Sequence, residues 1–160
     1  MASFKRDANL KTFFLKHLYR ISFFFIPYEK IVVDMAKEKF VGEYPINASK
    51  KMLYPYISTA SGLAQWFADD VNINEDKVYT FHWDGEDNMA KMTSSRLNHH
   101  VYFEFTDEKE DPNFIEIKLE MNELTQETFI RITDYSDLNP EETYALYESL
   151  IHELKEIVGG

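Results

Sequence analysis

The aspartate pair Asp69-Asp70 directly follows a Trp-Phe dipeptide in the stretch STASGLAQWFADDV. Two neighbouring carboxylates could serve as an acid/base pair or could help to hold a metal ion. Adjacent residues of an extended segment point to opposite sides, however, and a shared site on a helix needs a spacing of three or four residues. We therefore interpret both aspartates as solvated residues where a helix gives way to a strand.

The histidines are the other side chains that could bind a metal. They follow neither the H-x-x-x-H nor the H-E-x-x-H spacing, and His99 and His100 cannot both face one metal from a regular strand. Cysteine is absent, and the chain contains no G-x-S-x-G, P-loop or G-x-G-x-x-G motif. The sequence therefore predicts no metal, no cofactor and no catalytic residue, and an enzyme is less favoured than a binding protein.

The charge of the chain limits its partners. Its net charge is -11, from 17 basic and 28 acidic residues. Such a surface repels phosphate backbones and anionic membranes, so we expect no nucleic-acid partner. The sequence contains no window of about 20 apolar residues, which is the length that a membrane-spanning helix needs. The lack of cysteine fits a reducing compartment, and we expect a cytoplasmic protein.

Residues 1–34 differ from the rest of the chain in charge. They carry six basic and three acidic residues, net +3, which leaves -14 for residues 35–160. No A-x-A-like cleavage site follows the aromatic run at residues 22–28, as a secretory signal would require. An amphipathic interfacial helix over residues 10–25 is a second possibility. We favour a basic, aromatic extension outside the folded domain, which then comprises residues 35–160.

The first half of this domain predicts one strand and two short helices. Residues 40–46 partly alternate and predict a strand, and Pro45 places it at a sheet edge or a strand end. Asn47 or Ser49 can cap the first helix, which Pro55 should kink or end. Thr59 or Ser61 can cap the second. Its apolar face comprises Leu63, Trp66 and Phe67.

After Asp70 the apolar period changes from about 3.6 residues to 2, which predicts successive antiparallel strands joined by short turns. The strands fall within residues 77–85, 88–96, 100–107, 114–123 and 127–136. One face of this sheet is apolar: Tyr79, Phe81, Trp83, Val101, Phe103, Phe105, Ile115, Ile117, Leu119, Met121, Ile130 and Ile132.

The chain ends in one long predicted helix. Asn139 is a suitable N-cap, Pro140 suits the first helical position, and Gly159 supplies a stop. A single apolar stripe runs along it: Tyr147, Leu150, Ile151, Leu154, Ile157 and Val158. We predict an α+β fold in which a curved antiparallel sheet of about six or seven strands wraps around this helix.

This order of elements, and several of its residues, resemble the START-like superfamily, also called SRPBCC or helix-grip. The subgroup that it resembles is the domain related to activators of the ATPase of the ninety-kilodalton heat-shock chaperone. The matching residues are Tyr54, Ser58, Thr59, Gly62, Leu63, Trp66, Phe67, Trp83, Leu150 and Leu154. The last helix lacks the tryptophan of many relatives and has Tyr144 and Tyr147 in that region.

The resemblance implies an apolar cavity between the sheet and the last helix. We predict that Leu63, Trp66 and Phe67 form a lid, and that Tyr54, Tyr56, Tyr79 or Trp83 supplies polar contacts. Because aromatic residues at this spacing most often form core, a filled interior stays open as an alternative. The predicted cavity residues are Tyr54, Leu63, Trp66, Phe67, Tyr79, Phe81, Trp83, Phe103, Phe105, Tyr147, Leu150, Ile151 and Leu154.

Three functions follow from the resemblance. The first is a non-enzymatic binding module for an apolar or aromatic small molecule or a lipid. The second is a protein-interaction domain, such as a chaperone regulator, whose acidic surface could meet a basic partner. The third is a polyketide cyclase or aromatase, which would need a polar residue pointing into the cavity. The sequence leaves the oligomeric state open.

Overall fold

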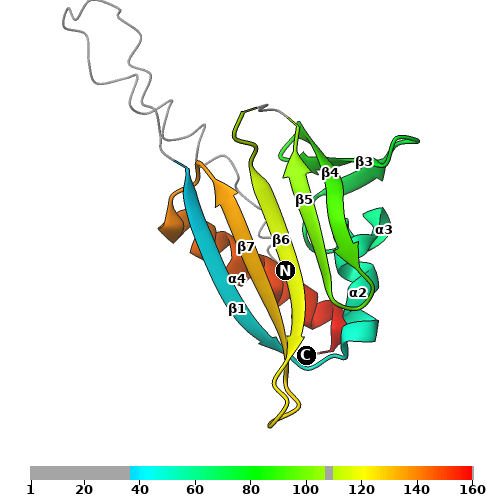
Figure 1. Cartoon of the computed structure of the whole chain (residues 1–160), viewed down its shortest axis with the longest axis vertical. Coiled ribbons are helices and arrows are strands. Elements are labelled where there is room, and N and C mark those ends of the chain that lie inside the picture. The colour runs from blue at the N-terminus through cyan, green and yellow to red at the C-terminus, as the bar shows by residue number, and fades with distance from the viewer. Residues whose placement is uncertain (1–36, 107–109, 160) are drawn as a thin grey trace, which may run out of the picture.

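The computed structural model describes residues 37–106 and 110–159 (Figure 1). The predicted extension at residues 1–34 therefore lies outside the described residues. The elements follow in the order β1 (Glu38–Ile46), α2 (Lys50–Ser58), α3 (Ala60–Leu63), β2 (Asp70–Ile73), β3 (Val78–Trp83), β4 (Glu86–Arg96), β5 (His100–Phe105), β6 (Phe114–Met121), β7 (Thr128–Ser136) and α4 (Pro140–Val158).

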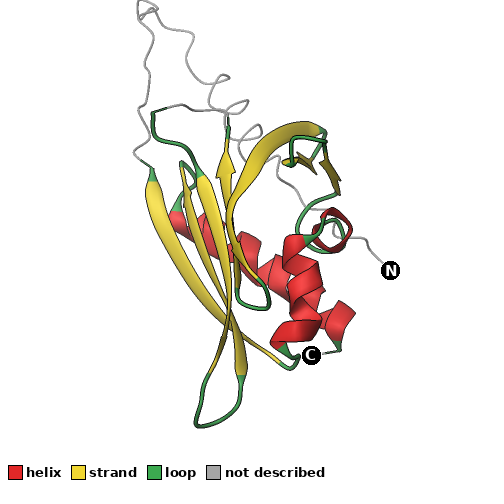
Figure 2. Ribbon diagram, turned by 45° about the vertical axis from the view of Figure 1, so that its right-hand side comes forward, coloured by secondary structure: helices red, strands yellow, loops and turns green. Residues whose placement is uncertain are grey.

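The strands form one antiparallel sheet in the order β1-β7-β6-β5-β4-β3-β2. The sheet curves around α4, and α2 and α3 lie at the side of the same layer (Figure 2). The predicted α+β helix-grip architecture is confirmed, and Pro45 does lie in an edge strand. The short edge strand β2 was not among the predicted strands, because its four residues, DVNI, are too few to establish a period and only Val71 is buried.

The alternation along the strands placed their side chains on the correct faces. Ile117 of β6 lies opposite Ile132 of β7, and both are buried against α4. Met121 is an exception, with 43% of its surface exposed. It ends β6 where the β6–β7 hairpin projects beyond the helix layer, so none of the described helices covers its inner face (Figure 1).

The helix caps follow the sequence closely. Ser49 accepts a hydrogen bond from the Met52 N–H, and Asn139 accepts one from the Glu142 N–H. Gly159 ends α4 in the left-handed conformation that glycine favours, with φ 79°. Pro55, which was predicted to kink or end the first helix, does not end it, because α2 continues to Ser58. The Pro55 carbonyl instead accepts the Thr59 N–H, and this bond closes the last turn.

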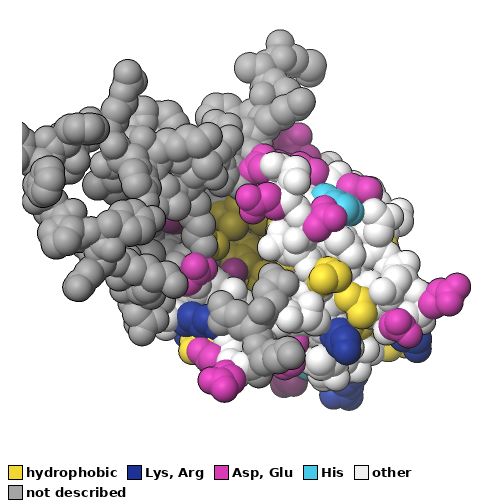
Figure 3. Space-filling model, turned by 90° about the horizontal axis from the view of Figure 1, so that it is seen from above, with side chains coloured by type: hydrophobic (Ala, Val, Ile, Leu, Met, Phe, Trp, Pro, Cys, Tyr) yellow, Lys and Arg dark blue, Asp and Glu magenta, His cyan; other side chains and the backbone are white. Residues whose placement is uncertain are grey.

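Within the residues that the structure describes, one end of the layer between the sheet and α4 is open. The term open end refers below to the side of this layer at which β1 and β6 begin and β5 ends. Figure 3 looks down on this end and shows hydrophobic side chains inside a hollow, with acidic side chains along part of its visible rim. Partly buried aromatic residues occur at the corresponding strand ends: Phe40, Trp83 and Phe105.

Candidate functional site

Asp69 lies in an exposed bend and Asp70 is the exposed first residue of β2, so both are solvated where the helical segment gives way to a strand, as predicted. The Asp69 carboxylate accepts a hydrogen bond from the Asp84 N–H at 2.9 Å, and the Asp70 carboxylate accepts one from the Val71 N–H at 2.9 Å. Among the described residues, no group of three or more His, Asp or Glu side chains could hold a metal ion. The aspartates therefore shape the turn between the helices and the sheet.

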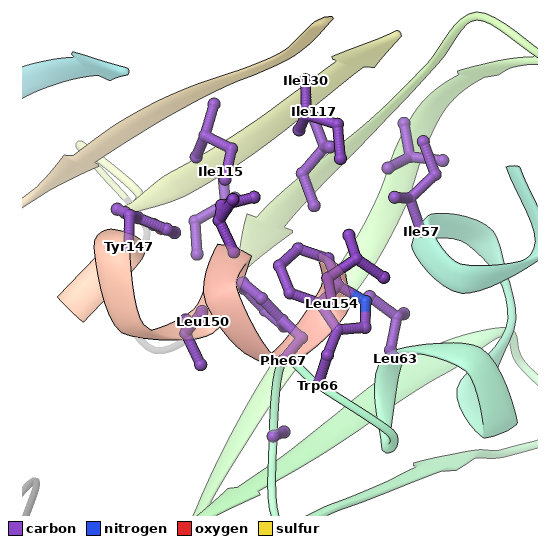
Figure 4. Packing of buried hydrophobic residues seen from close by; sticks show 14 of the residues in the cluster. Ile57, Leu63, Trp66, Phe67, Ile115, Ile117, Ile130, Tyr147, Leu150 and Leu154 are labelled. Carbon is purple, nitrogen blue, oxygen red and sulfur yellow. The ribbon is translucent and has the colours of Figure 1, made fainter. Parts of the chain in front are cut away.

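An aromatic layer fills the space between the sheet and the short helices. The Phe81 ring lies 5.4 Å from Phe103 and 5.6 Å from Phe67, in edge-to-face contacts. Trp66 and Phe67 lie between α4 and the sheet, beside Leu150 and Leu154 (Figure 4). Such ring pairs contribute about 0.5–1.5 kcal/mol each beyond their buried area.

The polar tips of this layer bond to the backbone of the chain itself. The Trp66 Nε1–H donates to the Tyr56 carbonyl at 2.9 Å, and the Trp83 Nε1–H donates to the Phe67 carbonyl at 2.8 Å. The Tyr79 hydroxyl donates to the Ser58 carbonyl at 3.0 Å. The bonds from Tyr79 and Trp83 fasten the segment at residues 56–67 to β3, whereas the bond from Trp66 closes that segment on itself. They also occupy the donors of Tyr79 and Trp83 that we predicted as ligand contacts.

All thirteen predicted cavity residues meet in this layer, but with different exposure. Tyr54, Trp83 and Phe105 are partly buried and pack against the core. The others are buried: Leu63, Trp66, Phe67, Tyr79, Phe81, Phe103, Tyr147, Leu150, Ile151 and Leu154. A role in ligand binding stays a prediction for each of them, and the partly buried residues are the ones that a bound molecule could reach without displacing core.

The sequence reasoning missed a polar pair on the inner face. The Tyr147 hydroxyl of α4 donates a hydrogen bond to the Asp134 carboxylate of β7 at 2.6 Å. Both side chains are buried, with 1% and 4% of their surfaces exposed. Extending the alternation of Ile130 and Ile132 by two residues would have found Asp134. The inner face, which the alternation predicted to be almost wholly apolar, therefore carries a buried carboxylate.

Burial sets the ionisation of this region. It raises the pKa of Tyr147 well above the ordinary value for tyrosine, and the negative charge of Asp134 adds to the effect. Burial, with a further contribution from Glu148, raises the pKa of Tyr44 to about 12. Both phenols therefore stay protonated at neutral pH, and Tyr147 acts as a donor to Asp134.

We expect the stability of the domain to fall as the pH rises from 10 to about 12. In the unfolded chain the Tyr44 phenol ionises near its ordinary pKa of 10.0, whereas in the fold its pKa is about 12. The stabilisation is complete below pH 10 and is lost as ionisation in that range favours the unfolded chain. Urea midpoints at pH 9 and pH 11 measure the fall. Tyr44→Phe should reduce it, and an unchanged fall would contradict this origin.

Arg131 and Glu104 are charged residues that, if they pointed into the cavity, would have favoured an enzyme. Both lie on the outer face of the sheet. Arg131 pairs there with Glu43 and, at 3.3 Å, with Glu120. Glu104 lies opposite Lys91 and Phe114, whose side chains share that face. The outward positions of these residues agree with the predicted alternation, whereas Asp134 of β7 is a charged residue that faces inward.

Comparison with known proteins agrees with this architecture. The family model described as a START-like superfamily domain matches residues 35–160. A Bacteroides fragilis protein with a solution NMR structure is 38% identical, over 71% of this chain and 82% of its own, with a TM-score of 0.52. No curated protein matches the chain.

More distant structures share the fold. The Aha1 dimer of Colwellia psychrerythraea is 20% identical, over 76% of this chain and 96% of its own, with a TM-score of 0.62. CalU16 of Micromonospora echinospora is 11% identical, over 77% of this chain and 86% of its own, with a TM-score of 0.57. None of the helices described for our chain is long and apolar enough to cross a membrane. The chain belongs to the START-like superfamily.

Proposed function

We propose that this protein binds an apolar or aromatic small molecule or a lipid at the open end, without chemical conversion. The observation that carries the proposal is the partial exposure of Trp83 and Phe105 next to a fully packed aromatic layer. The two rings lie 6.2 Å apart. A flat apolar molecule that extends this stack would bury aromatic surface that the described residues leave partly exposed.

The buried pair Asp134–Tyr147 supports a ligand with one polar group. Binding pockets combine an apolar lining with a few placed polar groups. Asp134 lies in one cross-strand row with Ile115 and Phe103, on the face that carries Phe105. A carboxylate can accept several hydrogen bonds, so a ligand hydroxyl or amine could join the bond from Tyr147.

Fluorescence titration with the neutral probe N-phenyl-1-naphthylamine tests the proposal. Phe105→Ala should weaken probe binding about tenfold, because it removes an aromatic wall of the open end. Phe114→Ala is the matched control, since this phenylalanine is also partly buried but lies on the outer face. It should leave the affinity unchanged. Equal effects of the two variants, or no saturable binding by the wild type, would refute the proposed site.

A protein-interaction role, such as chaperone regulation, is the second candidate. It is favoured by a row of stacked aromatic rings on the outer face of the sheet. Tyr102 and Phe114 lie 4.9 Å apart, and Phe114 and Tyr135 lie 5.4 Å apart. Aromatic side chains are enriched at protein interfaces. If the wild type binds no small apolar probe and Phe114→Ala instead abolishes binding to an isolated partner, this role replaces the first.

We further propose that residues 1–34 lie outside the folding unit. Removing them should leave the melting temperature of the domain unchanged within about 2 °C, since the elements from β1 onward complete the sheet. Removing residues 1–46, which also deletes β1, is the control and should unfold the protein. Differential scanning calorimetry compares the three chains. A large loss from the shorter deletion would place the extension within the fold.

A further inference from the structure

The outer edge of β1 offers a row of backbone groups for pairing. Within the described residues β1 has a neighbouring strand on one side only, namely β7. Pro45 has no N–H and suits an edge position that faces away from the neighbour. Backbone groups of an antiparallel strand point alternately to its two sides. Lys39, Val41 and Glu43 therefore direct their N–H and C=O groups to the open side, together with Pro45.

The side chains along this edge are complementary to themselves. Antiparallel pairing of β1 with a second β1, centred on Val41, places Val41 opposite its copy. The same register places Lys39 opposite Glu43 of the second chain, and Glu43 opposite Lys39. Opposite charges directly across a strand pair stabilise it, whereas like charges destabilise it. We propose that β1 is a dimerisation edge that recruits a second copy of this chain in this register.

The exposure of the β1 side chains in the single chain fits a second copy of the chain as the pairing partner. Val41 is 52% exposed although it lies at the middle of a strand. The Glu43 side chain is 53% exposed while it pairs with Arg131, so its carboxylate can also receive Lys39 of the second chain. Charged residues often protect an edge strand from pairing. Here one register turns the same charges into two ion pairs around an apolar centre.

A groove of about 310 Å³ lies beside the same edge. It lies between the second half of β1 and α4. Its lining residues are Glu43, Tyr44, Pro45, Glu148, Ile151, His152 and Lys155. Pairing along β1 would bring the second chain next to this groove. The dimer would then bury surface of α4 as well as the strand edge, which a specific interface requires.

Two charge-reversal variants of the full chain test the proposal by analytical ultracentrifugation at high micromolar concentration. Lys39→Glu and Glu43→Lys each place like charges opposite one another in their own homodimers, so each should raise the dimer dissociation constant at least about tenfold. Mixed in equal amounts, they should form a heterodimer with both ion pairs restored. Lys91→Glu, an exposed reversal on β4, should dimerise like the wild type.

A third variant tests the backbone part of the proposal. Val41→Pro removes the central N–H of the edge. This variant should therefore be monomeric, while its melting temperature stays equal to that of the wild type. Glu43→Lys also removes the pair with Arg131, and its melting temperature separates misfolding from lost association. A wild type that stays monomeric, or a mixture of the reversals that forms no heterodimer although both are folded, would overturn the proposal.

Discussion

Replacing Trp66 with alanine is expected to destabilise the domain by about 3–5 kcal/mol, which is the usual cost of deleting a buried aromatic side chain. Trp66 has no exposed surface and contacts the Phe67 ring at 5.3 Å. The substitution also leaves the Tyr56 carbonyl without its donor. Since a domain of this size has roughly 5–15 kcal/mol of stability, the loss should be visible as a large drop in the urea midpoint.

The same variant decides between core and lid. If Trp66 is core, the loss of stability is large, and the affinity of N-phenyl-1-naphthylamine changes little in the variant that remains folded. If Trp66 is a lid, the loss of binding free energy for the probe exceeds the loss of unfolding free energy. Trp66→Phe is the control, because it keeps an aromatic ring in the layer and loses only the hydrogen bond and part of the indole volume. We expect core behaviour, since Leu63 and Phe67 on either side are equally buried.

Tyr147→Phe is expected to cost about 1–3 kcal/mol, although it removes a single oxygen atom, because it takes a donor from a buried carboxylate. The hydroxyl lies 2.6 Å from Asp134, and both residues are shielded from water. Urea unfolding gives the free energy of each variant. Adding Asp134→Leu should cost less in Tyr147→Phe than in the wild type, since the two groups interact.

The surface offers a matched control for this pair. The Tyr135 hydroxyl donates to Asp111 at 3.0 Å in an exposed position. Tyr135→Phe removes the same kind of bond at a solvent-exposed position. We expect the free energy of unfolding to change by no more than about 0.5 kcal/mol. A similar cost for both substitutions would contradict the expectation that burial of the Asp134–Tyr147 pair strengthens the contribution of its hydrogen bond.

The sheet and the long helix could be predicted because their signals are local and repeated. The strands β3, β5, β6 and β7 each have one buried face, so alternation along the chain reports burial directly, whereas β4 buries only Ala90 and alternates weakly. The signals at the start of α4 likewise lie within four consecutive residues, from Asn139 to Glu142. Ile157 shows the limit of periodicity: it fits the apolar stripe but is 38% exposed in the last turn of α4.

The candidate site was harder to predict because it depends on contacts between distant residues. The bond from Trp83 to the Phe67 carbonyl spans 16 residues, and no spacing rule indicates it. Asp134 looks like a surface residue in isolation, and only its position two residues after Ile132 shows that it faces inward. The division of the aromatic residues into packed layer and partly exposed rim likewise depends on the curvature of the sheet.

Ligand binding at the open end is tested most directly by comparing the mass of the purified protein under native and denaturing conditions. We predict a native species that is heavier than the chain and that releases an apolar molecule on denaturation, with Phe105→Ala retaining less of it than Phe114→Ala. Identical native and denatured masses, together with no saturable binding of N-phenyl-1-naphthylamine, would contradict the proposal and favour the protein-interaction role.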